Sequence, residues 1–229
     1  MQVLQGSLVA LVTPMLPNGD IDYQSLEKLI DWHIQQGTDG IVSVGTTGES
    51  ATLNVKEHLE VLAFTIKYVD RRIPVIAGTG ANSTIEAIEL TSEAKRLGAD
   101  HVLLVTPYYN KPNQKGLISH YSAIADAVNI SQILYNVPSR TACDLLPSTV
   151  AILSNHKNIT GIKEAVADEI RIKELVAISK DVNNEFLIFS GDDPTFMKSL
   201  LLGTHGVISV SANVSPNTHS QICAAVRNG

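Results

Sequence analysis

One lysine stands where the surrounding residues predict a buried strand. Lys163 directly follows the apolar run Ile159–Ile162, and lysine is rarely buried unless its charge is paired. One interpretation is an ion pair with an acidic neighbour. The other is that burial lowers the pKa of the amine from about 10.4 toward neutrality, leaving a free amine that can attack a carbonyl carbon. The pattern alone leaves both interpretations open.

Hydroxyl side chains gather in short segments that follow other apolar runs, at Thr46, Thr47, Tyr108, Tyr109 and Tyr135. Each could simply satisfy a local backbone group. Together they could form a chain of hydroxyls that carries protons to and from an imine or enamine. Arg140 is expected in a loop after the run that ends at Tyr135, either as a solvated charge or as a bidentate clamp for a substrate carboxylate.

Other catalytic motifs are incomplete. The Gly-Thr-Thr-Gly of residues 45–48 lacks the lysine of a P-loop, and Gly78-Thr79-Gly80 lacks the third glycine of a dinucleotide fingerprint. The seven histidines include no paired metal-binding motif. We therefore expect neither a metal nor a cofactor, and imine formation is then the natural way to stabilise a carbanion.

Short, nearly continuous apolar runs recur along the chain, as is typical of parallel strands buried on both faces. They are Leu8–Val12, Gly40–Val44, Pro74–Ala77, His101–Val105, Gln132–Tyr135, Ile159–Ile162, Phe186–Phe189 and Gly206–Val210. The residues singled out above follow the ends of these runs. In a barrel of parallel strands those ends meet at one rim, where catalytic groups gather.

Helical patterns separate the apolar runs. Leu26, Leu29, Ile30 and Ile34 repeat at helical spacing before Gly37, and further patterns include Leu59–Ile66 and Leu175–Ile178. Capping is predicted from the pair Ser83 and Glu86, from Gly98, and from the dipeptides Asp193-Pro194 and Ser215-Pro216.

Eight alternating strand and helix units predict an α/β fold, a closed (β/α)₈ TIM barrel. The alternative, an open doubly wound sheet, usually carries a glycine-rich turn after its first strand. Here Thr13-Pro14-Met15-Leu16-Pro17 occupies that place, so the barrel is favoured.

The composition favours an enzyme or a binding protein that handles small molecules. Charged residues make up only 17% of the chain, and the net charge is −6 without a basic run, which argues against nucleic acid or membrane partners. The cysteines Cys143 and Cys223 form no spaced motif and are expected to be reduced. With no leader or membrane-length apolar run seen, we expect a cytoplasmic protein.

Seven ordered blocks resemble one known family along nearly the whole chain. The blocks are GTTGESATLN, IPVIAGTGAN, TPYYNKP, YNVPSRT, GIKEA, SGDD and GVISV, and the family is that of the dihydrodipicolinate synthases, within the pyruvate-dependent class I aldolase or N-acetylneuraminate lyase superfamily. The resemblance implies a lyase of lysine and diaminopimelate biosynthesis. Its members condense pyruvate with L-aspartate 4-semialdehyde through a Schiff base and yield 4-hydroxy-tetrahydrodipicolinate.

The resemblance also implies roles for individual residues. Lys163 would form the Schiff base, and Tyr135, Thr47 and Tyr109 would relay protons, Tyr109 being supplied by the neighbouring subunit of a homo-oligomer that is a dimer of dimers. Arg140 would hold the carboxylate of aspartate semialdehyde. The pyruvate end would be lined by Thr46, Gly191 and the backbone at Ile208.

Some relatives are inhibited by lysine at a subunit interface. The residues that match that site are Ser50, Ala51, His58, Asn82, Glu86 and Tyr108, whereas Val55 stands where inhibited relatives often carry histidine. The resemblance therefore leaves lysine inhibition open, and any inhibition is expected to be weak.

Family members continue past the eighth helix into a further helical region. We therefore expect residues 1–229 to form one barrel domain that is truncated after that helix, and expect the truncated form to be less stable and less active than one of family length.

Two other functions fit parts of the pattern. A sister lyase, cleaving N-acetylneuraminate or a keto-deoxy sugar acid, would share the lysine, the tyrosine and the first block. The YNVPSRT block with Arg140 favours the short, carboxylate-bearing substrate instead. A barrel that binds ligands without catalysis is the second alternative, which the full set of reactive residues disfavours.

Overall fold

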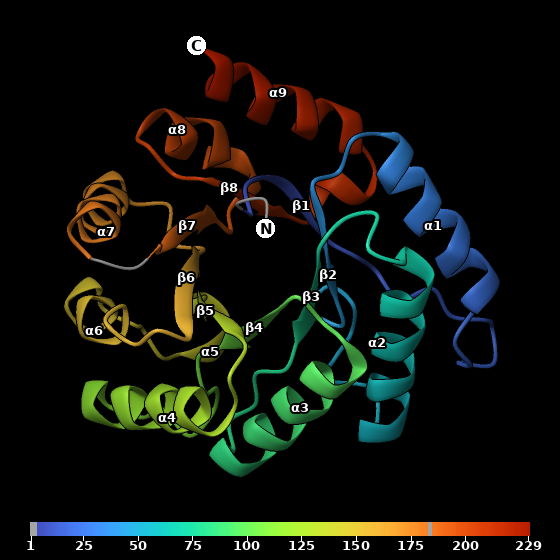
Figure 1. Ribbon diagram of the computed structural model, residues 1–229, viewed down its shortest axis with the longest axis horizontal. Coiled ribbons are helices and arrows are strands. Elements are labelled where there is room, and N and C mark those ends of the chain that lie inside the picture. The colour runs from blue at the N-terminus through green and yellow to red at the C-terminus, as the bar shows by residue number, and fades with distance from the viewer. Residues whose placement is uncertain (1–3, 183–184) are drawn as a thin grey trace.

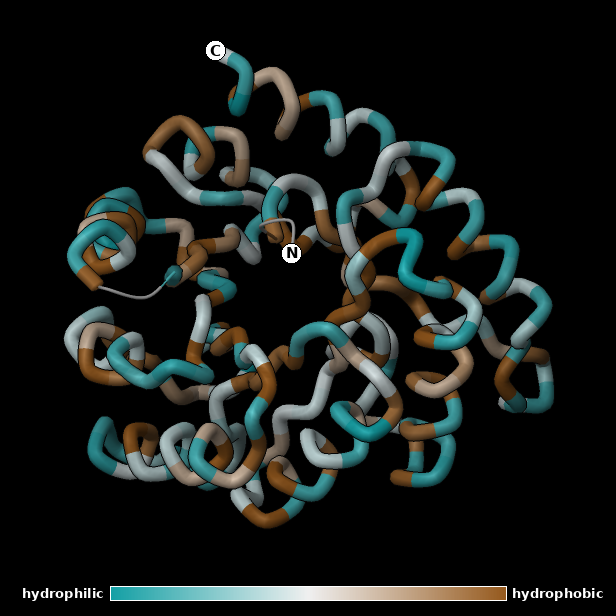
Figure 2. Tube along the Cα trace, viewed as in Figure 1, coloured by the Kyte–Doolittle hydropathy of each residue, from teal (hydrophilic) through white to brown (hydrophobic). Residues whose placement is uncertain are grey.

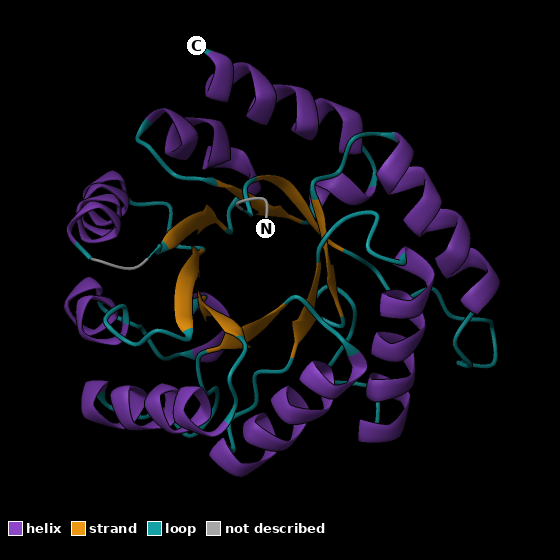
Figure 3. Ribbon diagram, viewed as in Figure 1, coloured by secondary structure: helices purple, strands orange, loops and turns teal. Residues whose placement is uncertain are grey.

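The computed structural model describes residues 4–182 and 185–229, and it forms a closed barrel of parallel strands in the order β1 to β8. The predicted (β/α)₈ barrel is therefore confirmed, and the open sheet is wrong. Figure 3 shows the strands as an inner ring and the helices as an outer ring. The strands are β1 (Gly6–Ala10), β2 (Gly40–Ser43), β3 (Val75–Gly78), β4 (His101–Val105), β5 (Ser131–Asn136), β6 (Ile159–Glu164), β7 (Leu187–Ser190) and β8 (Gly206–Ser209).

The helices cover the outside of the barrel in chain order (Figure 1). They are α1 (Tyr23–Gln35), α2 (Val55–Val69), α3 (Thr84–Leu97), α4 (Gln114–Ala127), α5 (Pro138–Thr141), α6 (Pro147–Leu153), α7 (Glu169–Asp181), α8 (Phe196–Leu201) and α9 (Pro216–Asn228), with 3₁₀ turns η1 (Asp193–Thr195) and η2 (Ser211–Asn213). Within residues 4–182 and 185–229, no helix combines the length and apolar composition needed to cross a membrane.

Local capping signals explain several helix ends. Gly98 ends α3 with φ 96°, a conformation that glycine adopts without the steric cost of a Cβ atom. The Ser83 hydroxyl caps α3 by accepting from the Glu86 N–H, as predicted. The full reciprocal capping box lies elsewhere, between Asn54 and Glu57 at the start of α2.

Two predicted caps are wrong in detail. Asp192, not Asp193, caps η1 by accepting from the Thr195 N–H, and Asp193 instead accepts from the N–H groups of Val210 and Ser211. Ser215 precedes Pro216 at the start of α9 but makes no side-chain cap, because its hydroxyl donates to the Ser211 carbonyl. In both cases a contact with the loop after β8 takes the side chain away from its own helix.

The strand bounds differ from prediction where polar side chains continue a strand. β5 and β6 extend to Asn136 and Glu164, beyond the predicted ends at Tyr135 and Ile162. Backbone pairing with the neighbouring strand, rather than hydropathy, decides where each strand ends.

The strands divide the apolar core into an outer and an inner layer. The outer layer lies between strands and helices, and Figure 2 shows apolar and polar residues alternating along those helices. The inner layer fills the barrel and includes Leu8, Val42, Ile76, Phe189 and Ile208. Successive side chains of a strand point to opposite faces, so each strand contributes to both layers.

Candidate active site

Lys163 points into the barrel because of the two-residue period of β6. Its neighbour Ile162 belongs to the outer layer, so Lys163 falls on the inner face, where it pairs in register with Tyr135 on β5 and Phe189 on β7. The side chain is only 4% exposed. Among the described residues it takes part in no salt bridge, which removes the ion-pair interpretation.

Burial gives the Lys163 amine the properties of a nucleophile. Loss of hydration disfavours the charged form and lowers the pKa of Lys163 to about 8, with Asp193 opposing the shift and the positive Arg140 adding to it. A substantial fraction of the amine is therefore neutral near physiological pH, which an exposed lysine would not achieve.

Tyr135 lies directly against this amine. Its ring centroid is 4.3 Å from the Lys163 Nζ atom, as their register partnership requires. Burial raises the pKa of Tyr135, while Arg140 lowers it, so the phenol keeps its proton in the resting site. The hydroxyl can therefore donate a proton and recover it.

Thr46 and Thr47 lie in the turn that follows β2. Val44, at the start of this turn, has φ 52°, which is unusual for a β-branched residue and holds the backbone away from a strand path. Both threonines border the cavity that contains Lys163.

Arg140 lies in the one-turn helix α5, not in the loop that was predicted. Pro138 begins the turn with its backbone preset for a helix, and the Thr141 hydroxyl lies within hydrogen-bond distance of the carbonyls of Val137 and Cys143. Four residues are too few for a periodic apolar pattern, which is why sequence analysis gave a loop here.

A cavity of about 370 Å³ at the carboxyl ends of the strands brings most of the predicted residues together. Its lining includes Thr46, Thr47, Tyr135, Arg140, Lys163 and Gly191. Gly191 is in close contact with Lys163, since a Cβ atom there would lie 2.9 Å from Lys163 Cε. A glycine is therefore needed for the lysine to keep this position.

Two predicted residues lie outside this lining. Ile208 is fully buried in the inner layer of the barrel. Tyr109 is 91% exposed with φ 72°, so a single chain does not bring its hydroxyl to Thr47 and Tyr135. Conversely, Ser139 and Asp192 line the cavity although sequence analysis did not select them. Their only signal was membership of the strand-end blocks YNVPSRT and SGDD.

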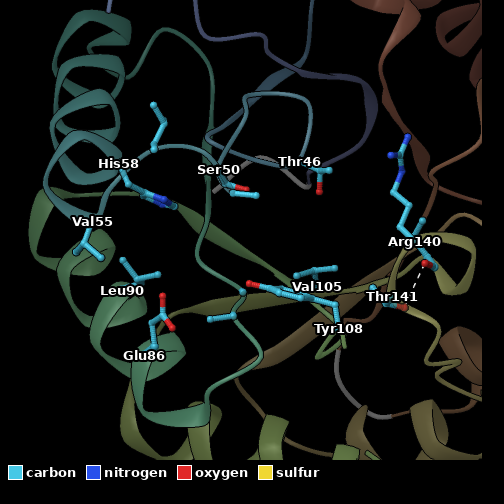
Figure 4. A pocket seen from close by; sticks show the side chains of 15 residues that line it. Thr46, Ser50, Val55, His58, Glu86, Leu90, Val105, Tyr108, Arg140 and Thr141 are labelled. Atoms are coloured by element: carbon cyan, nitrogen blue, oxygen red, sulfur yellow. Dashed lines mark hydrogen bonds between the residues drawn. The ribbon is translucent and has the colours of Figure 1, made fainter. Parts of the chain in front are cut away.

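A second cavity of about 230 Å³ adjoins the first and shares Thr46, Val137 and Arg140 with it. Figure 4 shows Glu86, His58 and Tyr108 around this space. Two further residues of the predicted lysine site, Ser50 and Ala51, also line this cavity. Val55, which stands where inhibited relatives often carry histidine, lines it too. Asn82 is absent from the lining, and its side-chain amide donates to the Tyr108 carbonyl instead.

The sequence model of the Dihydrodipicolinate synthetase family matches residues 3–229. A 4-hydroxy-tetrahydrodipicolinate synthase of Pseudomonas syringae pv. syringae is 60% identical over 227 residues, which are 99% of this chain and 77% of that protein.

Solved structures agree with the sequence comparison. A chloride-inhibited dihydrodipicolinate synthase from Acinetobacter baumannii, complexed with pyruvate, superposes with a TM-score of 0.94 at 54% identity, covering 99% of this chain and 77% of that one. The enzyme from Cyanidioschyzon merolae with lysine bound has a TM-score of 0.91 at 36% identity, covering 98% and 75% respectively.

Proposed function

This chain belongs to the dihydrodipicolinate synthetase family, and we propose that it performs its reaction through a Schiff base on Lys163. The activity is that of a 4-hydroxy-tetrahydrodipicolinate synthase, a lyase that joins pyruvate to L-aspartate 4-semialdehyde. The observation that carries the proposal is the buried Lys163 amine, with its pKa lowered to about 8, beside Tyr135 in a cavity that Arg140 also lines.

The neutral amine of Lys163 attacks the ketone carbon of pyruvate. Water leaves as the carbinolamine becomes a protonated imine, which withdraws electrons from the adjacent methyl group. Loss of a methyl proton then gives an enamine, whose carbon forms a bond to the aldehyde carbon of the second substrate. The aldehyde oxygen takes up a proton and becomes the 4-hydroxyl. The substrate's own amine finally displaces Lys163 from the imine carbon, which closes the ring and frees the enzyme.

Tyr135 is proposed to move the protons of these steps. Its hydroxyl belongs to a side chain in contact with Lys163, and Thr47 lines the same cavity. Tyr109, exposed on the loop after β4, is proposed to complete the relay in the site of a neighbouring subunit. This requires a homo-oligomer, and we propose a dimer of dimers acting in the cytoplasm.

Arg140 is proposed to recognise the carboxylate of aspartate semialdehyde. Replacing Arg140 with alanine is expected to raise the KM for the semialdehyde by about 10- to 100-fold, the loss of a charged hydrogen-bonding pair, and to change the KM for pyruvate little. Steady-state kinetics with each substrate varied in turn measure both constants. Arg140→Lys keeps the charge but cannot form two parallel hydrogen bonds, so its KM for the semialdehyde should lie between those of the wild type and Arg140→Ala. Equal increases for both substrates would contradict the assignment.

A direct assay tests the function as a whole. Pyruvate and aspartate semialdehyde are supplied together with the reductase that consumes the product, and cleavage of N-acetylneuraminate is measured in parallel. Turnover is expected only in the first assay. Turnover only in the second would identify a sugar-acid lyase, and binding of pyruvate without either reaction would identify a non-catalytic barrel.

Lysine is proposed to bind in the second cavity near Glu86 and His58. The Glu86 carboxylate can pair with an ammonium group, and burial lowers the pKa of His58, so that its ring stays neutral while Nε2–H donates to the Gly78 carbonyl at 2.8 Å. Titration calorimetry with lysine should give heat that Glu86→Ala abolishes. Glu89→Ala on the same helix is the matched control, because Glu89 is exposed and outside the cavity. An absence of heat at millimolar lysine would leave the enzyme uninhibited, with Val55 as the first residue to replace by histidine.

A further inference from the structure

A second group of charged residues lies on the outer face of the barrel, behind the catalytic pair. Glu164 follows Lys163 on β6, and Asn136 follows Tyr135 on β5, and these two outer residues are themselves partners in register. The two-residue period therefore places Tyr135 and Lys163 inside the barrel and Asn136 and Glu164 outside it. Neither outer residue lines either cavity.

The Glu164 carboxylate is fully buried and is stabilised from three sides. The Asn136 amide donates to both of its oxygens at 3.1 Å, the Val166 N–H donates at 2.8 Å, and Arg171 Nη1 on α7 donates at 3.2 Å. Burial raises the pKa of Glu164, and these donors oppose that effect. A buried charge of this kind is tolerated only with such partners, and loss of one partner is costly.

Arg171 joins this carboxylate to the segment that carries Arg140. Its Nη2 and Nη1 atoms lie 2.6 and 3.0 Å from the two oxygens of Asp144, and Nη1 also donates to the Leu145 carbonyl at 3.2 Å. This bidentate pair is the strong geometry for a guanidinium and a carboxylate.

The Asn136 side chain holds the far end of the same segment by hydrogen bonds to Asp144 and Leu145. Its amide nitrogen donates to Asp144 Oδ1 at 2.9 Å, and its amide oxygen accepts from the Leu145 N–H at 2.9 Å. Residues 137–145, including Arg140, therefore leave β5 at Asn136 and return to the Asn136 side chain. Lys163 is held differently, by backbone pairing of β6 with β5 and β7.

We propose that Arg171, with Glu164 and Asp144, positions the Arg140 turn, so that recognition of the carboxylate-bearing second substrate depends on an ionic network outside the active site. This inference rests on the proposed role of Arg140. Arg171 is a positioning residue, since it does not line the substrate cavity.

Arg171→Lys tests the inference in the full chain. Lysine keeps the charge but cannot pair with both Asp144 oxygens while reaching Glu164. The KM for aspartate semialdehyde is expected to rise about 10- to 100-fold, as small displacements of a binding group can cause. The KM for pyruvate and the rate of borohydride-trapped Schiff-base formation should stay within about twofold. Glu169→Gln is the matched control on α7, because it removes only a surface ion pair with Lys198.

Two further measurements separate positioning from general destabilisation. Arg171→Lys added to Arg140→Ala should raise the KM no further, because both changes act through one side chain. Hydrogen exchange of the Leu145 amide should be faster in Arg171→Lys than in the wild type, and this measurement does not depend on which substrate the enzyme uses. Asp144→Asn, which retains the size of the side chain, serves if Arg171→Lys does not fold.

The results separate failure of the positioning role of Arg171 from failure of the proposed role of Arg140. If Arg140→Ala affects the semialdehyde selectively but Arg171→Lys and Asp144→Asn do not, the network does not position Arg140 and the inference is wrong. If Arg140→Ala raises both KM values equally, the role of Arg140 fails and the inference fails with it. Faster Leu145 exchange in that case would still show that Arg171 holds the segment.

Discussion

Replacement of Lys163 with methionine is expected to lower turnover by at least about 10⁴-fold, the scale of losing a covalent nucleophile. Methionine fills similar space without an amine, and removing a buried cationic group should not destabilise the barrel. Borohydride reduction in the presence of pyruvate should add one reduced pyruvate to the wild-type peptide that contains Lys163, and none to the variant. Mass spectrometry of the digested protein measures this directly. Modification of another lysine in active wild-type enzyme would overturn the assignment.

The pH dependence of Schiff-base formation gives an independent check on Lys163. Only the neutral amine attacks, and its pKa is lowered to about 8. The rate of imine formation with pyruvate should therefore rise about tenfold per pH unit below pH 8 and level off above it. A rise that continues to about pH 10 would describe an ordinary exposed lysine and would contradict the buried site.

Removal of the Tyr135 hydroxyl is expected to lower kcat by about 10²- to 10⁴-fold, the usual contribution of general acid–base catalysis. The physical reason is that the Tyr135 ring lies 4.3 Å from Lys163 Nζ and its phenol keeps its proton. Tyr135→Phe leaves the ring in place, and Thr47→Val removes the threonine hydroxyl assigned to the relay at constant shape. Steady-state kinetics of both variants measure kcat, and stopped-flow kinetics measure the rates of the individual proton-transfer steps.

The double variant decides whether these hydroxyls form one relay. If they act as a unit, Tyr135→Phe combined with Thr47→Val should be hardly slower than the worse single variant. Multiplied losses would show independent roles. For Tyr109, mixing Tyr109→Phe chains with Lys163→Met chains should restore some activity, because a hybrid dimer then contains one site with all its residues. No recovery on mixing would show that Tyr109 acts within its own chain or not at all.

Local sequence patterns were enough to predict the barrel and to single out Lys163, but not to choose between its ion-pair and nucleophile interpretations. Continuous apolar runs predicted all eight strands, because burial on both faces demands apolar side chains at every position. Lys163 stood out because a charge in such a run is costly without a purpose. The residues themselves suggested a hydroxyl relay and a carboxylate clamp. The family resemblance assigned these roles to Tyr135, Thr47 and Arg140, and they remain predictions.

Only the tertiary structure decided how these groups meet. The register of β5 against β6 places the Tyr135 ring 4.3 Å from Lys163 Nζ, and burial in the closed barrel sets the lowered pKa of that amine. The helical turn under Arg140, the exposure of Tyr109 and the Glu164–Arg171–Asp144 network were not predicted from the sequence. The turn is too short for a periodic pattern, and the network depends on residues distant in the chain, whereas propensity and hydropathy describe only neighbours. Arg171 and Asp144 are 27 residues apart, yet Arg171 Nη2 lies 2.6 Å from Asp144 Oδ2.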